Sequence, residues 1–489
     1  MAQHKMFKQF SHFFGATVIA QLLGLVTFPI LTRLLSIEQY GTFALIGTTA
    51  MLIVPLGKLG LSEAVIRFYA RYSRKPPALA ALVSTGIFAS CVLGAITAGT
   101  CLVLLAGLYW LGVFPNTEML LCFLLLALPV AIRPTIAVAM SFMRVLGRSS
   151  AYAKVAVLSR IITSLLGLLC LWTAHGVLSR YYIGTGIGDV LLFLALWLWL
   201  RRNFSFAMRG ASSRLARKMI RFGAPMVISE MGYVVLSYAD RYMLAAIAGT
   251  AAAGLYSAGY NLVNYIGGSV MFAVSYAVTP AYVEAFQSKG RKGAEKIVEQ
   301  AMTYLLSGAM LVMSGYFSVS RELIIVLASY KYLPVVASTN VILFGVLVLT
   351  INEVLKAGLY LEKRSGMIMF LVVMAAVLNL VLNWMLIPVH GVMGAAIATL
   401  GAACVLAAAT WWTCRRCLTV RVDTGRLIGY GFAALTVLLV LRSVALGSPG
   451  ATLVAKLLVG GTICAAWILA LERHVVLRFL RGRDQQPAV

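Results

Sequence analysis

Acidic residues are scarce in this chain. Asp and Glu together number 15 among 489 residues, and no two of them form an Asp-x-Asp pattern. Glycosyltransferases and glycan polymerases usually need paired carboxylates or a metal-binding acidic motif on an extramembrane loop. The loops between apolar stretches are short, and the longest covers only residues 201–221. The sequence therefore argues against enzymatic activity of this kind.

Metal-binding side chains are few and scattered. The five histidines stand far apart, and most of the eight cysteines lie inside apolar stretches, where a thiol behaves as a small hydrophobic group. The single Cys-x-x-Cys motif, Cys414 to Cys417, has no second pair of zinc ligands nearby. We expect no metal site, no cofactor and no disulfide framework.

Charge of either sign is rare. The chain is 11% charged and 61% hydrophobic, with a mean hydropathy of +0.92, far outside the range of soluble domains. The net charge of +26 is spread over short loops and forms no continuous stripe. It therefore indicates membrane topology and attraction to anionic lipid, and it argues against nucleic-acid binding. The composition predicts an all-α integral membrane protein.

Long apolar stretches follow one another along the whole chain. Most contain about 20 or more predominantly apolar residues, the length that a helix needs to cross hydrocarbon. We expect about 14 transmembrane helices, at residues 12–35, 41–66, 79–110, 118–143, 152–174, 178–200, 222–247, 253–283, 300–319, 333–355, 366–387, 391–413, 427–446 and 452–471.

Basic residues gather in every second gap between these stretches. Clusters begin with Lys5 and Lys8, recur after each even-numbered stretch, and end in the C-terminal tail. Because cytoplasmic loops carry the excess of Lys and Arg, both termini of this multi-pass chain should be cytoplasmic. The first stretch is too long for the apolar region of a signal peptide, so we expect it to remain as a helix.

The chain contains an internal repeat. A shift of 208 residues superimposes Phe14-Gly15-Ala16 on Phe222-Gly223-Ala224 and Arg33 on Arg241. Six predicted spans separate the copies, so both would enter the membrane from the same side, as in parallel-repeat transporters. The pattern predicts six-helix lobes at 1–205 and 206–420, followed by two additional helices and a tail at 421–489. The alternative is that two membrane helices share small residues by coincidence.

Several cations lie within or at the ends of predicted spans. An ionisable group at membrane depth costs about 2.5–3.5 kcal/mol even on a lenient scale, so each should face a wet cavity, a partner or the bundle interior. Arginine presents a planar fork that matches phosphate oxygens, so a cavity with several arginines suits a phosphorylated anion. The candidates are Arg33, Lys58, Arg133, Arg160 and Arg241.

Each of these cations also has an ordinary interpretation. Arg33 stands close to a membrane interface, where a long side chain can reach the headgroups, and any of them can pair with an acid. Arg133 is bracketed by Pro129 and Pro134. Because proline leaves a backbone carbonyl without its helical partner, we expect the span to be broken or kinked there.

Other polar side chains within the spans suggest additional roles. Glu230, Asp240 and Asp189 are candidates for binding a coupling ion. Tyr256, Tyr260 and Asn264 follow a spacing of four residues, with Asn261 on an adjoining stripe, and such a helix face could stack against sugar rings and hydrogen-bond to them. Packing between helices is the alternative for the tyrosine face.

Several segments together resemble one transporter family. They are residues 28–36 (FPILTRLLS) with Tyr40-Gly41, Arg67-Phe68-Tyr69, Asp240-Arg241-Tyr242, Gly254-Leu255-Tyr256-Ser257, and the stretch from Asn379 to Thr399. Their order and spacing resemble the polysaccharide transporter branch of the multidrug/oligosaccharidyl-lipid/polysaccharide exporter superfamily, and the likeness covers nearly the whole chain. Arg33 and Arg241 match motif arginines of that family.

The resemblance implies a flippase in the inner membrane. Such a protein moves an undecaprenyl-diphosphate-linked glycan outward by alternating access for surface polysaccharide (O-antigen, capsule or exopolysaccharide) biosynthesis. The implied fold has two six-helix lobes around a cationic cavity, often with two extra helices. Its implied partners are membrane lipids, a glycan polymerase and chain-length machinery. The alternative is a cation-coupled multidrug exporter of the same superfamily, which needs carboxylates in its lobes, and a membrane glycan polymerase or glycosyltransferase ranks below both.

Overall fold

The computed structural model of the full chain describes residues 2–73, 75–112, 116–204, 207–418, 420 and 422–473. Side chains are described for these residues apart from 2–14, 16, 17, 208, 229 and 266–277. Within these ranges every regular element is an α-helix or a 3-10 helix. The predicted tail after residue 473 lies outside the described residues.

Contacts between Cα atoms divide the chain into two compact units. The first consists of Met1–Ser257 with Val372–Gly391, and the second of Ala258–Leu371 with Val392–Val489. The lobe boundaries expected at residues 205 and 420 rest on the internal repeat and stay a prediction.

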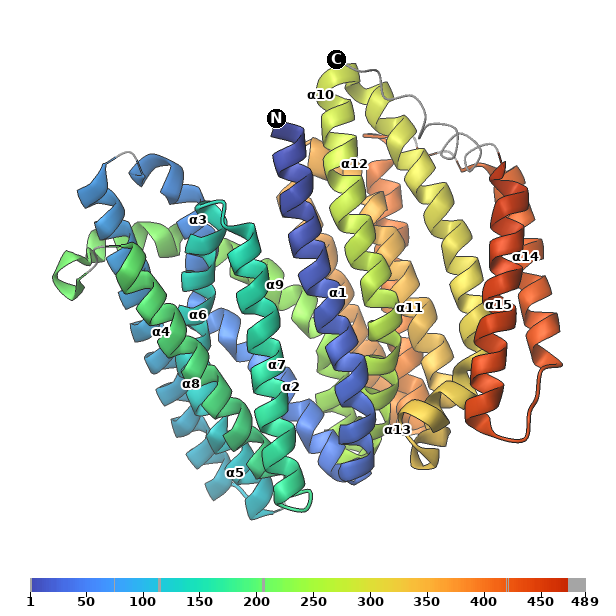
Figure 1. Cartoon of the computed structure of the whole chain (residues 1–489), viewed down its shortest axis with the longest axis horizontal. Coiled ribbons are helices and arrows are strands. Elements are labelled where there is room, and N and C mark those ends of the chain that lie inside the picture. The colour runs from blue at the N-terminus through green and yellow to red at the C-terminus, as the bar shows by residue number, and fades with distance from the viewer. Residues whose placement is uncertain are drawn as a thin grey trace. The chain divides into compact units, whose positions relative to one another are not determined.

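The first unit contains nine complete helices and parts of two others in the described residues (Figure 1). Within it, α7 packs on α1 and α8, α6 on α4 and α8, and α2 on α6 and α9. A buried apolar core forms where α3, α4, α6, α8 and α9 meet. The helices are α1 (Ala2–Leu34), α2 (Ile37–Lys58), α3 (Leu61–Tyr72), α4 (Pro76–Trp110), α5 (Thr117–Leu125), α6 (Ala127–Val145), α7 (Ser149–Thr173), α8 (Leu178–Asn203) and α9 (Ser213–Ala248), with the start of α10 and part of α13.

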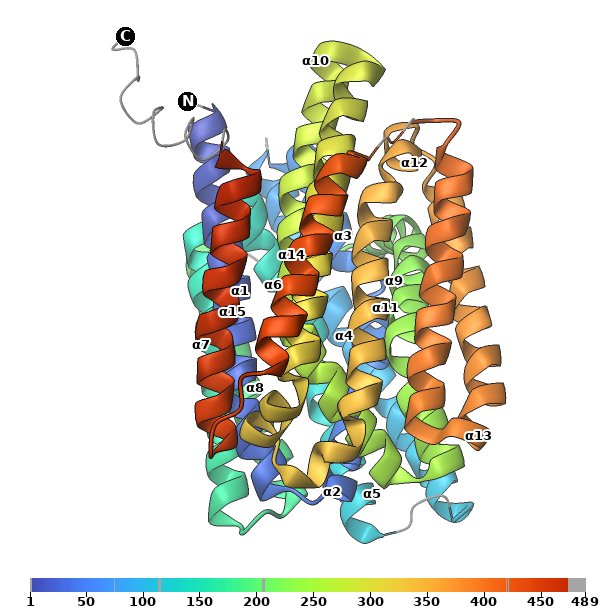
Figure 2. The ribbon, with the colours of Figure 1, turned by 90° about the vertical axis from the view of Figure 1, so that its right-hand side faces the viewer.

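The second unit contains most of two very long helices and four complete α-helices in its described part. In α10 the residue Gly290 has a φ of 65°, and the helix changes direction there. In α13 the helix changes direction at Gly391, which has a φ of 52°. Helices α14 and α15 pack together as an antiparallel pair (Figure 2). The helices are α10 (Thr250–Leu327), α11 (Val336–Leu355), α12 (Ala357–Leu361), α13 (Ser365–Cys414), α14 (Thr424–Arg442) and α15 (Pro449–Leu471).

The expectation of an all-α membrane protein with many spans is confirmed. Eleven helical segments among the described residues are long and apolar enough to cross a membrane, and Val18–Leu34 is a shorter apolar helix. The predicted number of fourteen is not confirmed. One reason is that the stretches expected at 366–387 and 391–413 both lie in α13, where only Gly391 leaves helical geometry.

The sequence around α2 fixes both of its ends. Ser36 and Gln39 form a capping box, in which each side chain accepts a hydrogen bond from the other residue's backbone N–H. At the other end, Leu59 and Gly60 have φ values of 40° and 69°. This left-handed pair ends the helix at Lys58 and lets α3 begin at Leu61.

Glycines bring helices of the first unit into backbone contact. A Cβ on Gly41 of α2 would lie 2.0 Å from the carbonyl oxygen of Thr250, and one on Gly254 would lie 2.1 Å from that of Ile37. Gly60 and Gly223 meet in the same way, because a Cβ on Gly60 would lie 2.4 Å from the Gly223 backbone. Helix α2 therefore touches the start of α10 near its own first turns, and the chain just after α2 touches α9.

Replacement of Gly41 by alanine tests this backbone contact. The added methyl group would force α2 and α10 apart, and overpacking of this kind costs about 1–3 kcal/mol. We expect a lower melting temperature for the purified protein in detergent. Gly47→Ala is the matched control, because nothing lies within 4 Å of a Cβ at Gly47 of the same helix. Equal melting temperatures for the two variants would contradict the close approach.

Candidate functional site

Lys58 lies at the C-terminal end of α2 and pairs with Glu230 of α9. Its Nζ is 3.1 Å from Oε1 and 3.0 Å from Oε2 of Glu230, and 3.9 Å from Oε1 of Glu63. The Lys58 side chain is 15% exposed, whereas that of Glu230 is 39% exposed. Sequence reasoning assigned Lys58 to a phosphorylated anion and Glu230 to a coupling ion, and the structure brings the two together.

Arg133 of α6 pairs with Asp189 of α8. The Oδ2 atom of Asp189 accepts a hydrogen bond from Nε at 3.0 Å and forms an ion pair with Nη2 at 2.9 Å. Asp189 is buried, whereas 38% of the Arg133 side chain is exposed. The span is interrupted only ahead of Pro129, because α5 ends at Leu125 and α6 begins at Ala127, whereas α6 continues through Arg133 and Pro134, where the break was expected. The carboxylate occupies one edge of the guanidinium, and Nη1 lies on the other edge.

Asp240 and Arg241 form the third group, near the end of α9. Both side chains are buried, and Nη1 of Arg241 lies 3.7 Å from Oδ1 of Asp240. The guanidinium also donates to the Ser237 carbonyl at 3.0 Å and stacks over the Tyr238 ring at 4.5 Å. The Tyr256 hydroxyl donates a short hydrogen bond to Oδ2 of Asp240. This cluster holds the start of α10 against α9.

The remaining two predicted cations are exposed. Arg33 lies in the last turn of α1, and Arg160 lies near the middle of α7. Their assignment to a phosphorylated anion stays a prediction.

The predicted sugar-binding face is divided between buried and half-buried positions. Tyr256 and Tyr260 are buried, and Asn261 and Asn264 are half-buried. The Tyr256 hydroxyl already donates a hydrogen bond to Asp240. This contact supports the packing interpretation for Tyr256, and a sugar-binding role for the face stays a prediction.

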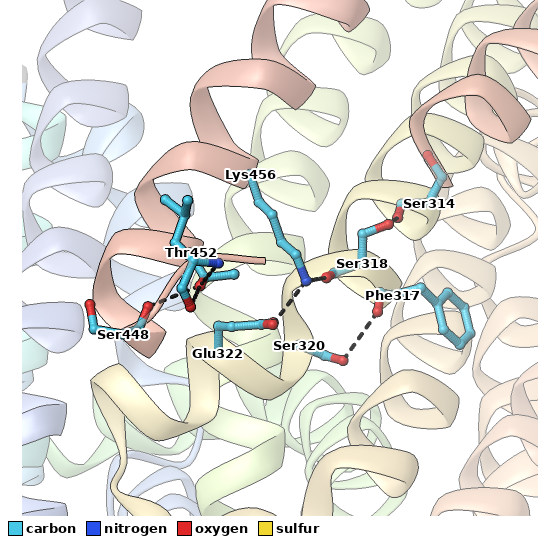
Figure 3. A network of polar contacts seen from close by, with 9 residues as sticks. Ser314, Phe317, Ser318, Ser320, Glu322, Ser448, Thr452 and Lys456 are labelled. Carbon is cyan, nitrogen blue, oxygen red and sulfur yellow. Dashed lines mark hydrogen bonds and ion pairs between the residues drawn. The ribbon is translucent and has the colours of Figure 1, made fainter. Parts of the chain in front are cut away.

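One intramembrane ion pair was missed by sequence reasoning. Lys456 of α15 donates to Glu322 Oε1 and to the Ser318 carbonyl, both at 2.8 Å and both on α10 (Figure 3). Lys456 is 8% exposed. Its position inside an otherwise apolar stretch was a usable signal, since buried lysines are almost always paired.

The chain also matches known proteins. A family model described as a polysaccharide biosynthesis protein matches residues 7–286, which is more than half of the chain. The chain belongs to this family. The matched range contains all five candidate cations and the three carboxylates of their ion pairs, and the resemblance stated from the sequence is confirmed.

Solved structures show that this member of the polysaccharide biosynthesis family has a transporter fold. Lipid II flippase MurJ in an inward closed conformation superposes with a TM-score of 0.77 at 15% identity, over 95% of this chain and 99% of that one. An inward-facing multidrug resistance MATE family transporter of the MOP superfamily superposes with a TM-score of 0.66 at 15% identity, over 81% and 94% of the two chains. At these identities the likeness establishes the fold.

One curated relative shares part of the family sequence. An uncharacterized membrane protein of Methanocaldococcus jannaschii is 26% identical over 197 residues. The match covers 38% of this chain and 37% of the length of that protein.

The pair between Arg133 and Asp189 can be tested for its part in folding. Asp189→Leu leaves the guanidinium without its acceptor, which should lower the free energy of unfolding by about 1–3 kcal/mol. Adding Arg133→Leu should recover part of this loss, because two apolar side chains replace a broken ion pair. Thermal unfolding in one detergent compares the variants. A double variant less stable than the single one would contradict the coupling.

Proposed function

We propose that this protein moves a polyprenyl-diphosphate-linked oligosaccharide from the cytoplasmic to the outer leaflet of the inner membrane. The product would supply O-antigen, capsule or exopolysaccharide synthesis. Family membership and the fold shared with a lipid II flippase support a lipid-linked substrate. The observation that carries the proposal is Arg133, a partly exposed guanidinium that Asp189 engages along one edge. The other edge can receive a phosphate oxygen.

The proposed topology follows from charge. Both termini face the cytoplasm, because clusters of Lys and Arg occupy every second loop. Transport proceeds by alternating access of two lobes, 1–205 and 206–420, with residues 421–489 as an accessory segment. A membrane potential that is negative inside favours outward movement of an anion by about 2.3 kcal/mol per charge per 100 mV.

The diphosphate would bind to five cations, four in the predicted lobe 1–205 and one in the predicted lobe 206–420. We assign it to Arg33, Lys58, Arg133, Arg160 and Arg241, with sugars toward Tyr260, Asn261 and Asn264. Three of these cations already carry a carboxylate partner. At Lys58 and Arg241 an arriving diphosphate would compete with that partner for the cation, whereas at Arg133 it would use the edge that Asp189 leaves open.

The second candidate function is export of organic cations. The MATE-like fold and the carboxylates Asp189, Glu230 and Asp240 favour it. Export of such cations, abolished by neutralising Glu230 or Asp240, would support it. Each of these carboxylates, however, contacts a lysine or arginine, which would repel an organic cation.

Neutralising single arginines tests the anion site. Arg33→Gln, Arg133→Gln and Arg241→Gln each remove charge-assisted hydrogen bonds worth about 1.5–3 kcal/mol, so flipping of a lipid-linked glycan in proteoliposomes should fall about tenfold or more. Arg291→Gln is the control, because Arg291 is exposed and pairs with Glu295 one turn farther along α10. Wild-type flipping in all three variants would refute the site, and melting temperatures separate loss of binding from loss of folding.

Glu230 can be tested as the competitor of the diphosphate. Glu230→Gln removes the charge beside Lys58, and because a partly exposed pair contributes up to about 1 kcal/mol, binding of an undecaprenyl diphosphate should tighten by up to about fivefold. Glu63→Gln is the matched control, since Glu63 lies farther away, at 3.9 Å. Microscale thermophoresis in detergent gives the dissociation constants. Weaker binding in Glu230→Gln would show that Glu230 helps to hold the substrate.

A further inference from the structure

The first unit encloses an apolar cavity of about 540 Å³ near one end of its helices. Its walls come from α2, the second half of α4, the helices α5 and α6, and the last turns of α9. The volume lies within the range of small-molecule sites, about 300–1,000 Å³. In Figure 1 the label α5 marks the end of the unit where these lining segments lie.

The second half of α4 follows a close contact between α4 and α6. A Cβ on Gly94 would lie 2.2 Å from the Ala131 carbonyl, so α4 and α6 touch at this level. After Gly94 most side chains of α4 are exposed, with Leu104 at 62% and Leu108 at 40%, although Ala98 is buried. Both leucines line the cavity. The wall formed by α4 is therefore partly open to the surroundings of the helix.

The lining offers no charged group to an ionic ligand and few polar groups to water, Thr250 among them. None of the lining residues is charged. Two lining hydroxyls, those of Thr49 and Tyr242, bond to each other and to the Leu45 carbonyl. A buried water needs two to four polar partners. If the cavity were empty, the side chains that line it would lack dispersion contacts on one side. The chemistry fits a hydrocarbon chain.

We propose that this cavity binds one acyl chain of a bilayer phospholipid. Tyr109 and Trp110 end α4, are 57% and 89% exposed, and mark the membrane interface just past Leu108. An acyl chain that descends from this level reaches the gap beside α4 directly. A diphosphate lipid has no cation among the lining residues to hold its headgroup, so the bulk phospholipid is the favoured occupant.

An acyl chain bound in the cavity would stabilise the contact between α2 and α9. Leu45, Thr49 and Ile53 of α2 face the cavity together with Tyr242 and Ala245 of α9. The hydrogen bond between Thr49 and Tyr242 joins the same two helices beside the cavity. A chain in the cavity therefore completes the packing of this arrangement, and this role does not depend on the identity of the transported substrate.

Photocrosslinking tests the proposal with the full-length chain in nanodiscs. One sample contains phosphatidylcholine with a diazirine on an acyl chain, and a second contains a diazirine-bearing polyprenyl diphosphate in unlabelled phosphatidylcholine. We expect the phospholipid probe to label the cavity-facing residues of α4 and α5–α6, as mapped by mass spectrometry. Labelling by the prenyl probe alone, or no labelling of these residues by either, would overturn the proposal.

Matched variants test whether the labelled acyl chain lies inside the cavity. Leu105→Trp narrows the cavity and should reduce the labelling of α5–α6, whereas Val103→Trp should leave it intact, because Val103 is 73% exposed and does not line the cavity. Ala245→Leu narrows the cavity from α9 and should reduce the same label, which keeps the test valid if Leu105→Trp fails to fold. Equal labelling in Val103→Trp and both narrowing variants would refute binding inside the cavity.

Discussion

The need to pair charge inside hydrocarbon organises this structure. An unpaired ionisable side chain at membrane depth costs about 2.5–3.5 kcal/mol or more, so a helix that carries one must meet its partner. Lys58 with Glu230 joins α2 to α9, and Arg133 with Asp189 joins α6 to α8. Asp240 links Arg241 to Tyr256 and so joins α9 to α10. In the proposed function, the contacts that hold these helices together would also be the contacts offered to an anion.

Two kinds of contact act on α2, and they differ in how readily they can be replaced. The approach of Gly41 to Thr250 depends on the absence of a side chain and admits no substitute. The pair between Lys58 and Glu230 is partly exposed, and another anion can take the place of the carboxylate. The two ends of one helix thus combine a fixed steric contact with an exchangeable electrostatic one. Such a helix can stay folded while its electrostatic partner changes.

The sequence allowed the helical class and the many spans to be predicted, because apolar length acts locally, whereas α6 passes without a break through Arg133, where the flanking prolines predicted one. The sequence also located the charged residues. Their partners could not be predicted, since Glu230 lies 172 residues from Lys58 and Asp189 lies 56 residues from Arg133. Hydropathy specifies neither the rotation of a helix nor its neighbours. The cavity beside α4 was equally hidden, because ordinary leucines, alanines and aromatic residues line it.

The pairing itself separates the two candidate substrates. A site for organic cations needs a carboxylate whose charge is not already balanced, whereas Asp189, Glu230 and Asp240 each contact a cation of the same unit. A guest cation would have to compete with a resident lysine or arginine for the carboxylate. In the proposed function, a guest diphosphate would compete with the carboxylate for the lysine or arginine, and it would bring more negative charge than one carboxylate. On this proposal the sign of the charge would distinguish the two guests.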